Sequence, residues 1–113
     1  MDRVVLCTRI EVELELAQAA RGVGNEGRAR VCARRAAGLA ANVYLERHAG
    51  NPSGRSTYEA LRHLARLESL PDSLRAAPRR LTVRVDQDFK LPQPQDPLED
   101  ARTLIEGLLQ TTD

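Results

Sequence analysis

The chain of 113 residues has very few aromatic side chains: two tyrosines, one phenylalanine and no tryptophan. A core with so few aromatics must be built from leucine, valine and alanine, which suits closely packed helices better than a β-sandwich. Proteins that bind single-stranded nucleic acid stack bases on exposed aromatic rings, and this chain can hardly supply such a platform. The scarcity of aromatics therefore favours an all-α fold and argues against a base-stacking function.

Other features are also scarce. The formal net charge is only +1, whereas a dedicated nucleic-acid binder usually carries a clear basic excess. No apolar run approaches the roughly 20 residues of a membrane span, and the first residues lack the layout of a signal peptide. Cys7 and Cys32 are far apart and have no metal-binding spacing. These absences predict a single cytoplasmic domain over residues 1–113, with no membrane segment, no metal, no cofactor and two buried free thiols.

The sequence motifs that could indicate a catalytic, phosphate-binding or metal-binding site are weak. Gly22, Gly24 and Gly27 spell G-x-G-x-x-G, but a phosphate-binding loop needs a strand running directly into the first glycine, so we interpret the segment as a turn between helices. His48 and His63 are the only histidines, and neither has the neighbours of a metal site. His48 is interpreted as a favourable charge at a helix C-terminus. The sequence thus predicts no catalytic residue.

Helix start signals recur along the chain. A long amphipathic helix is predicted over residues 26–48. Ser56 and Glu59 form a capping box before a leucine-rich stretch. Asp96 followed by Pro97 gives the clearest helix start of all, an N-cap residue and then proline at the first helical position. These signals predict at least three helices.

Two segments are ambiguous between helix and strand. Residues 3–20 alternate apolar and acidic side chains but also carry a helical apolar stripe and good helix formers, so we predict a helix there. Residues 79–89 show both periods and are left open. Between the predicted helices, Asp72 is predicted to cap a short turn that ends at Pro78. Residues 90–95 are predicted to form an extended loop because they contain two prolines.

The long helix 26–48 has two apolar stripes, so it is either central to its own bundle or shared with a partner subunit. The narrower stripe, Val31, Gly38 and Leu45, repeats every seven residues. Glycine costs about 1 kcal/mol in a helix interior, and close approach of another helix would explain it. We therefore predict a homodimer through this stripe. The broad stripe, predicted to face the monomer's core, comprises Ala29, Cys32, Ala33, Ala36, Leu39, Ala40, Val43 and Tyr44.

One polar group flanks the predicted dimer stripe. Arg34, Arg35 and Asn42 lie beside it on a helical projection, and a two-fold contact would bring two copies of the group together. Such a pair is predicted to form a basic groove for the phosphate of a nucleotide or nucleic acid, or for an acidic partner. The simpler interpretation is a solvated, arginine-rich helix flank.

The order of these elements resembles the prokaryotic HEPN domains over residues 10–110. The resemblance rests on the runs T-Y-E-A-L-R-H-L, L-P-D-S-L-R-A-A and D-P-L-E-D-A-R-T-L-I-E-G-L-L and on the Ala-rich helix before them. It implies an up-and-down bundle of four to five helices, commonly a homodimer and often paired with a minimal nucleotidyltransferase. Some members of the family are metal-independent ribonucleases.

In the ribonuclease members of that family, an arginine is followed by four to six residues and then by a histidine. No arginine stands in that window before His48 or His63, and Arg55 is one residue too far from His63. We therefore expect a non-catalytic interaction or regulatory subunit. The alternative is a divergent ribonuclease of a toxin–antitoxin or defence system, using Arg34, Arg35 or His63.

Overall fold

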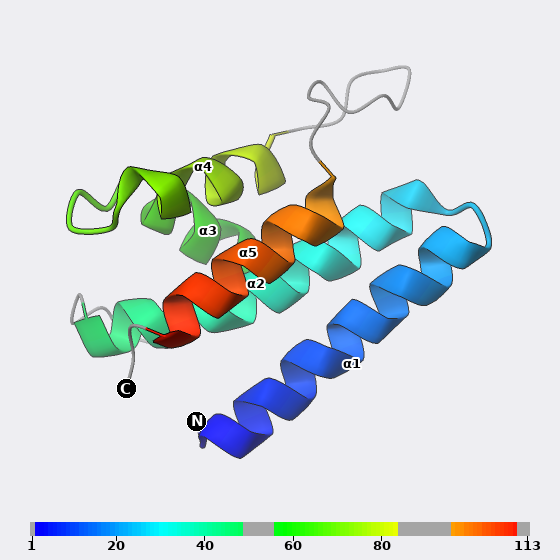
Figure 1. Ribbon diagram of the computed structural model, residues 1–113, viewed down its shortest axis with the longest axis horizontal. Coiled ribbons are helices and arrows are strands. Elements are labelled where there is room, and N and C mark those ends of the chain that lie inside the picture. Colours follow the sequence, from blue (N-terminus) through cyan, green and yellow to red (C-terminus); the bar gives the residue numbers. More distant parts are fainter. Residues whose placement is uncertain (1, 49–55, 84–95, 111–113) are drawn as a thin grey trace.

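The computed structural model describes residues 2–48, 56–83 and 96–110, and all regular secondary structure within them is helical. The all-α bundle predicted from the sequence is therefore confirmed (Figure 1). The helices, in chain order, are α1 (Arg3–Gly22), α2 (Glu26–His48), α3 (Thr57–Ala65), α4 (Asp72–Leu81) and α5 (Pro97–Gln110).

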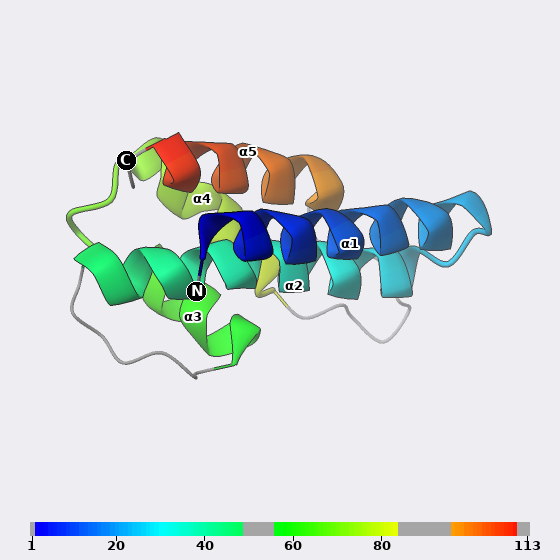
Figure 2. The same cartoon turned by 90° about the horizontal axis from the view of Figure 1, so that it is seen from below.

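Helix α2 is the centre of the bundle. It packs against α1, α3 and α5, while α4 packs against α3 and α5. Figures 1 and 2 show α1 at the edge of the molecule, alongside α2. The two apolar stripes of this helix were interpreted either as those of a helix central to its own bundle or as those of a helix shared with a partner subunit. The first interpretation is correct. Three helices can approach α2 because most of its buried side chains are small: Ala29, Cys32, Ala33, Ala36, Ala37, Gly38, Ala40 and Ala41.

The ambiguous segment near the N-terminus is helical, as predicted. Leu6, Ile10 and Ala17 are buried in the core at separations of four and seven residues, which places them on one face of a helix. Val12 and Leu16 are exposed. The strand-like alternation in the sequence therefore arises from two helical faces, one buried and one open to solvent, rather than from the two sides of a strand.

The glycine-rich segment is a turn between helices. Gly22 is the last residue of α1, and Gly24 has a φ of 80°, a conformation that only glycine adopts without strain. The side-chain oxygen of Asn25 then accepts a hydrogen bond from the backbone amide of Arg28 at 3.0 Å and so caps α2. Because a helix rather than a strand precedes the first glycine, the segment is not a dinucleotide-binding loop.

Two of the three predicted helix caps are present; Asp72 is instead the first residue of α4, whose N-cap is Pro71 with no side-chain cap hydrogen bond. The Ser56 hydroxyl accepts a hydrogen bond from the Glu59 amide at 3.1 Å, and Asp96 Oδ1 accepts one from the Leu98 amide at 2.9 Å. Asp96 is also bound through both carboxylate oxygens to the Arg21 guanidinium, at 2.9 and 2.7 Å. This single aspartate therefore joins the start of α5 to the end of α1.

Helix α4 differs from the prediction. It does not stop at Pro78 but continues to Leu81, with Thr82 as its C-cap. Proline lacks an amide hydrogen and so costs the helix one hydrogen bond. The following turn is held nonetheless, because the Pro78 carbonyl accepts hydrogen bonds from both the amide and the hydroxyl of Thr82. Of the segment 79–89, residues 84–89 lie outside the described residues, as does the predicted loop at 90–95.

An ion pair fixes α4 to α5. The Arg80 guanidinium donates to both carboxylate oxygens of Asp100, at 2.8 and 2.7 Å. Asp100 is buried, with 8 % of its surface exposed. Two parallel hydrogen bonds of this kind set orientation as well as distance, so they hold the C-terminal end of α4 in register with the first turn of α5.

Candidate functional site

The predicted dimer stripe is covered by the chain's own third helix. Gly38 and Leu45 are buried, and Val31 is half-buried. A Cβ atom added at Gly38 would overlap the Thr57 side chain and lie 2.7 Å from Thr57 Cα. Gly38 therefore allows the close approach of α3 rather than of a second copy. The prediction of a two-fold contact through Val31, Gly38 and Leu45 is wrong, because a helical projection gives the face but not which helix covers it.

The three predicted binding residues are only partly brought together. Arg34 is half-buried and places its guanidinium 5.6 Å from the centre of the Tyr58 ring. Arg35 is exposed, and Asn42 is half-buried. Neighbouring helical residues point about 100° apart, so Arg34 turns toward α3 while Arg35 turns to solvent. Only Arg34 belongs to the site described next.

A cluster of arginines surrounds Tyr58, and we call Arg30, Arg34, Arg62 and Tyr58 the Tyr58 cluster. The guanidinium of Arg62 lies 5.9 Å from the centre of the Tyr58 ring, so two cations contact one aromatic side chain. The Tyr58 hydroxyl donates a hydrogen bond to the Thr82 carbonyl at 3.3 Å. The cluster therefore joins α2, α3 and the C-terminal end of α4.

Arg30 is the buried member of this cluster, with 6 % of its surface exposed. Its guanidinium donates to the carbonyls of Arg80 and Val83, at the end of α4. Burial lowers the pKa of Arg30, and the nearby charge of Arg34 lowers it further. Arg30 was not among the residues predicted to form a site. The signal that was missed is its spacing of four residues from Arg34, which puts both on one side of α2.

Among the described residues, no carboxylate lies within ion-pair distance of Arg30, Arg34 or Arg62. Glu59 is nearby on α3 but forms no ion pair with Arg62. The cluster therefore gathers positive charge without an acidic counterpart in the part of the chain that the structure describes.

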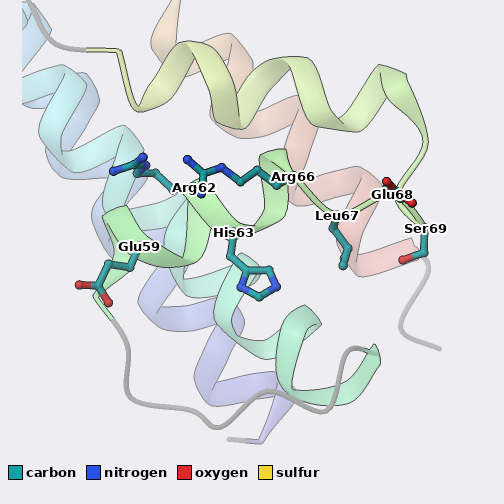
Figure 3. A pocket seen from close by; sticks show the side chains of 7 residues that line it. All are labelled: Glu59, Arg62, His63, Arg66, Leu67, Glu68 and Ser69. Atoms are coloured by element: carbon teal, nitrogen blue, oxygen red, sulfur yellow. The ribbon is translucent and has the colours of Figure 1, made fainter.

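His63 lies in a pocket of about 740 Å³ next to this cluster. In the close-up, the imidazole extends toward the end of α2, whereas Arg62 and Arg66 extend to the other side of α3 (Figure 3). A metal-independent ribonuclease needs a proton-transferring group and a cation at the same phosphate. The lining residues are Glu59, Arg62, His63, Arg66, Leu67, Glu68 and Ser69.

The largest exposed apolar feature was not predicted. Val5, Val12 and Leu16 on α1 and Val23 at its C-cap form one line, which we call the α1 stripe, because separations of seven, four and seven residues return to the same side of a helix. Their exposed fractions are 48 %, 49 %, 39 % and 83 %. Val4 is also exposed but lies about 100° away from this line. The helix prediction for this segment rested on its core-facing stripe, and the outward stripe was not predicted.

The remaining candidates are structural. His48 stacks on Tyr44 with ring centres 4.4 Å apart. Cys32 is buried as expected, while Cys7 is half-buried, and both are free thiols. Within the residues that the structure describes, no three His, Cys, Asp or Glu side chains gather as a metal site would require. None of the described helices is both long and apolar enough to cross a bilayer.

Comparison of the chain with models of known protein families, with curated proteins and with solved structures finds no match.

Proposed function

We propose that the chain is a non-catalytic interaction subunit that associates with a second copy of itself through the α1 stripe. The observation that carries this proposal is the line of four exposed apolar side chains, three on the edge helix of the bundle and one at its C-cap. Contiguous exposed apolar surface on a small protein marks an interaction site, whereas single exposed apolar residues need no explanation. Helix α1 makes its extended contact with α2, and the stripe lies outside that contact.

The spacing of the stripe favours a second, antiparallel copy as the occupant. Val5 and Val23 each lie nine residues from Leu14, and Val12 and Leu16 each lie two residues from it. A two-fold axis at the level of Leu14 therefore pairs Val5 with Val23 of the other copy and Val12 with Leu16. An isologous contact requires this kind of self-complementary pattern. Both two-fold-related pairs then bury apolar side chains that the single chain exposes.

The charges beside the stripe set the strength of the association. Glu13 and Glu15 flank it on either side and are present in both copies. Burying a valine or leucine side chain contributes at most about 1.5–3 kcal/mol, and these side chains are already partly covered. Association also costs on the order of 4–15 kcal/mol in lost freedom of motion. We therefore expect a weak dimer, with a dissociation constant between about 1 μM and 1 mM, that salt strengthens by screening the glutamates.

Sedimentation equilibrium tests the proposal with a matched pair of variants. Val12→Glu places a charge in the stripe and is expected to raise the dimer dissociation constant at least about tenfold, because a buried unpaired carboxylate is costly. Val4→Glu makes the same chemical change on the same helix but off the stripe, and should leave association unchanged. Both residues are exposed, so circular dichroism should show unchanged helix content. Equal association of Val12→Glu and the natural chain would contradict the proposal.

A divergent metal-independent ribonuclease is the second candidate. The observation in its favour is that Arg62, His63 and Arg66 line one pocket, but the imidazole and the two guanidinium groups extend to different sides of α3 (Figure 3). An RNA-cleavage assay with and without EDTA separates the two functions. Membership of the HEPN family and pairing with a minimal nucleotidyltransferase are further proposals, which rest on the order of the sequence motifs.

A further inference from the structure

The Tyr58 cluster has properties that the proposed self-association does not use. It lies at the junction of α2, α3 and α4, whereas the α1 stripe lies on the edge helix. Three guanidinium groups from two helices gather there, and no carboxylate of the described residues pairs with any of them. Like charges held together without a counterion repel one another, so an anion from outside the described residues would stabilise the arrangement.

Two members of the cluster, Arg30 and Tyr58, are held in place by hydrogen bonds before any ligand arrives. Arg30 is fixed by its hydrogen bonds to the Arg80 and Val83 carbonyls. Tyr58 is fixed by its hydroxyl, which donates to the Thr82 carbonyl. Arg34 and Arg62 are both positioned by the Tyr58 ring, at 5.6 and 5.9 Å from its centre. Side chains that are already ordered lose less conformational entropy on binding, which raises affinity.

The charged groups of the cluster are still accessible to solvent. Arg62 is exposed and Arg34 is half-buried, while Arg30 supports them from the interior. A guanidinium has five donors, and the hydrogen bonds of Arg30 to two carbonyls account for only part of its own set. Donors of Arg34 and Arg62 therefore remain for an incoming acceptor.

We propose that the Tyr58 cluster binds a phosphate group, either of a free nucleotide or of an RNA strand. A phosphate presents several charged oxygens in different directions and can accept hydrogen bonds from guanidinium groups that approach from two helices. A carboxylate presents two oxygens in one plane and matches a single guanidinium best. Base stacking is not the mode of binding, because the Tyr58 ring is already in contact with two guanidinium groups.

Fluorescence anisotropy and calorimetry on the full chain test this proposal. The probes are inorganic phosphate, ATP and a labelled single-stranded RNA of ten nucleotides, and polyglutamate serves as a polyanion without phosphate. The test variants are Arg34→Gln and Arg62→Gln. The matched control is Arg35→Gln, which removes the same charge from the neighbouring position of α2, where the side chain is exposed and outside the cluster. Circular dichroism and sedimentation of each variant check that the fold and self-association are unchanged.

We expect at least one phosphate probe to bind, with affinity falling at least about tenfold in Arg34→Gln and in Arg62→Gln and less than about twofold in Arg35→Gln. Binding of ATP and of inorganic phosphate identifies a nucleotide site, and binding of RNA alone identifies a strand. The proposal is overturned if no probe binds at millimolar concentration, if Arg35→Gln weakens binding as much as Arg34→Gln, or if polyglutamate binds as tightly as RNA. None of these outcomes depends on the dimer, so the two proposals fail separately.

Discussion

Replacing Gly38 by alanine is expected to destabilise the fold by about 3 kcal/mol, although alanine is the better helix former. The added Cβ would overlap the Thr57 side chain and come within 2.7 Å of the Thr57 Cα, a backbone atom that cannot rotate away. Helix α3 would have to move off α2, which opens the core around Leu61 and Leu64, both fully buried. Because small domains have stabilities of only about 5–15 kcal/mol, a substantial fraction of the variant should be unfolded under mild denaturing conditions.

Gly27→Ala is the matched control, because it makes the same substitution in the same helix. At Gly27 the nearest atom to the added Cβ is the Asn25 side-chain oxygen, at 3.9 Å. This variant should be as stable as the natural chain or more stable by up to about 0.5 kcal/mol, because alanine is the better helix former and Gly27 lies in the first turn of α2. Urea denaturation followed by circular dichroism measures both effects. If Gly38→Ala also stabilised the chain, the close contact between α2 and α3 would not exist.

Asp96 is expected to contribute about 2 kcal/mol through two separable interactions. Its side chain caps α5 by accepting from the Leu98 amide, which is worth about 1 kcal/mol. It also binds the Arg21 guanidinium through two hydrogen bonds, a partly exposed pair worth roughly 1 kcal/mol. Asp96→Ala removes both interactions. Asp96→Asn keeps a good cap residue and removes only the charge, so it should cost about half as much.

The charge interaction of Asp96 is also expected to depend on pH. The Arg21 guanidinium holds the pKa of Asp96 below its ordinary value, and the backbone amides of Leu98 and Glu99 add to the effect. A group whose pKa is lowered on folding stabilises the protein above its unfolded pKa, which for aspartate is about 3.9. That stabilisation is lost as the pH falls through the lower folded pKa.

Denaturation at several pH values measures this effect. The difference in unfolding free energy between the natural chain and Asp96→Asn should be largest near pH 7 and should shrink as the pH falls below about 4. If the difference in unfolding free energy between the two proteins stayed constant down to the lowest pH measured, the ion pair with Arg21 would not contribute to stability.

The helices could be predicted from the sequence because their signals are local. The capping residues Ser56 and Asp96 and the apolar period of residues 26–48 each depend on neighbours within a few positions. The end of α4 could not be predicted, because what holds the turn after Pro78 is Thr82 together with Arg30, which is 50 residues away from Arg80 in the chain. Long-range contacts of this kind leave no periodic pattern.

The candidate sites also divide into local features that the sequence predicts and long-range contacts that it does not. The projection of α2 correctly placed Gly38 at a close approach between helices, but it could not say that Thr57 of the same chain is the neighbour. Arg34 was selected for its position beside an apolar stripe, and yet its partner is the Tyr58 ring, which Arg62 also contacts, rather than Arg35 and Asn42. The outward face of α1 was readable from the spacing of Val5, Val12 and Leu16, once one side of that helix is known to be buried.

The most direct test of self-association through the α1 stripe is the distance between two copies of the same spin label, measured by pulsed electron resonance in a Cys7→Ser background. Val4 lies ten residues before Leu14 and Glu15 lies one residue after it. At a rise of 1.5 Å per residue, an antiparallel dimer separates the two copies of position 4 by about 30 Å along the helix and those of position 15 by about 3 Å. We expect a long distance for labels at Val4→Cys and a short one at Glu15→Cys. Short distances at both positions, or no dipolar coupling at either, would contradict self-association through the α1 stripe.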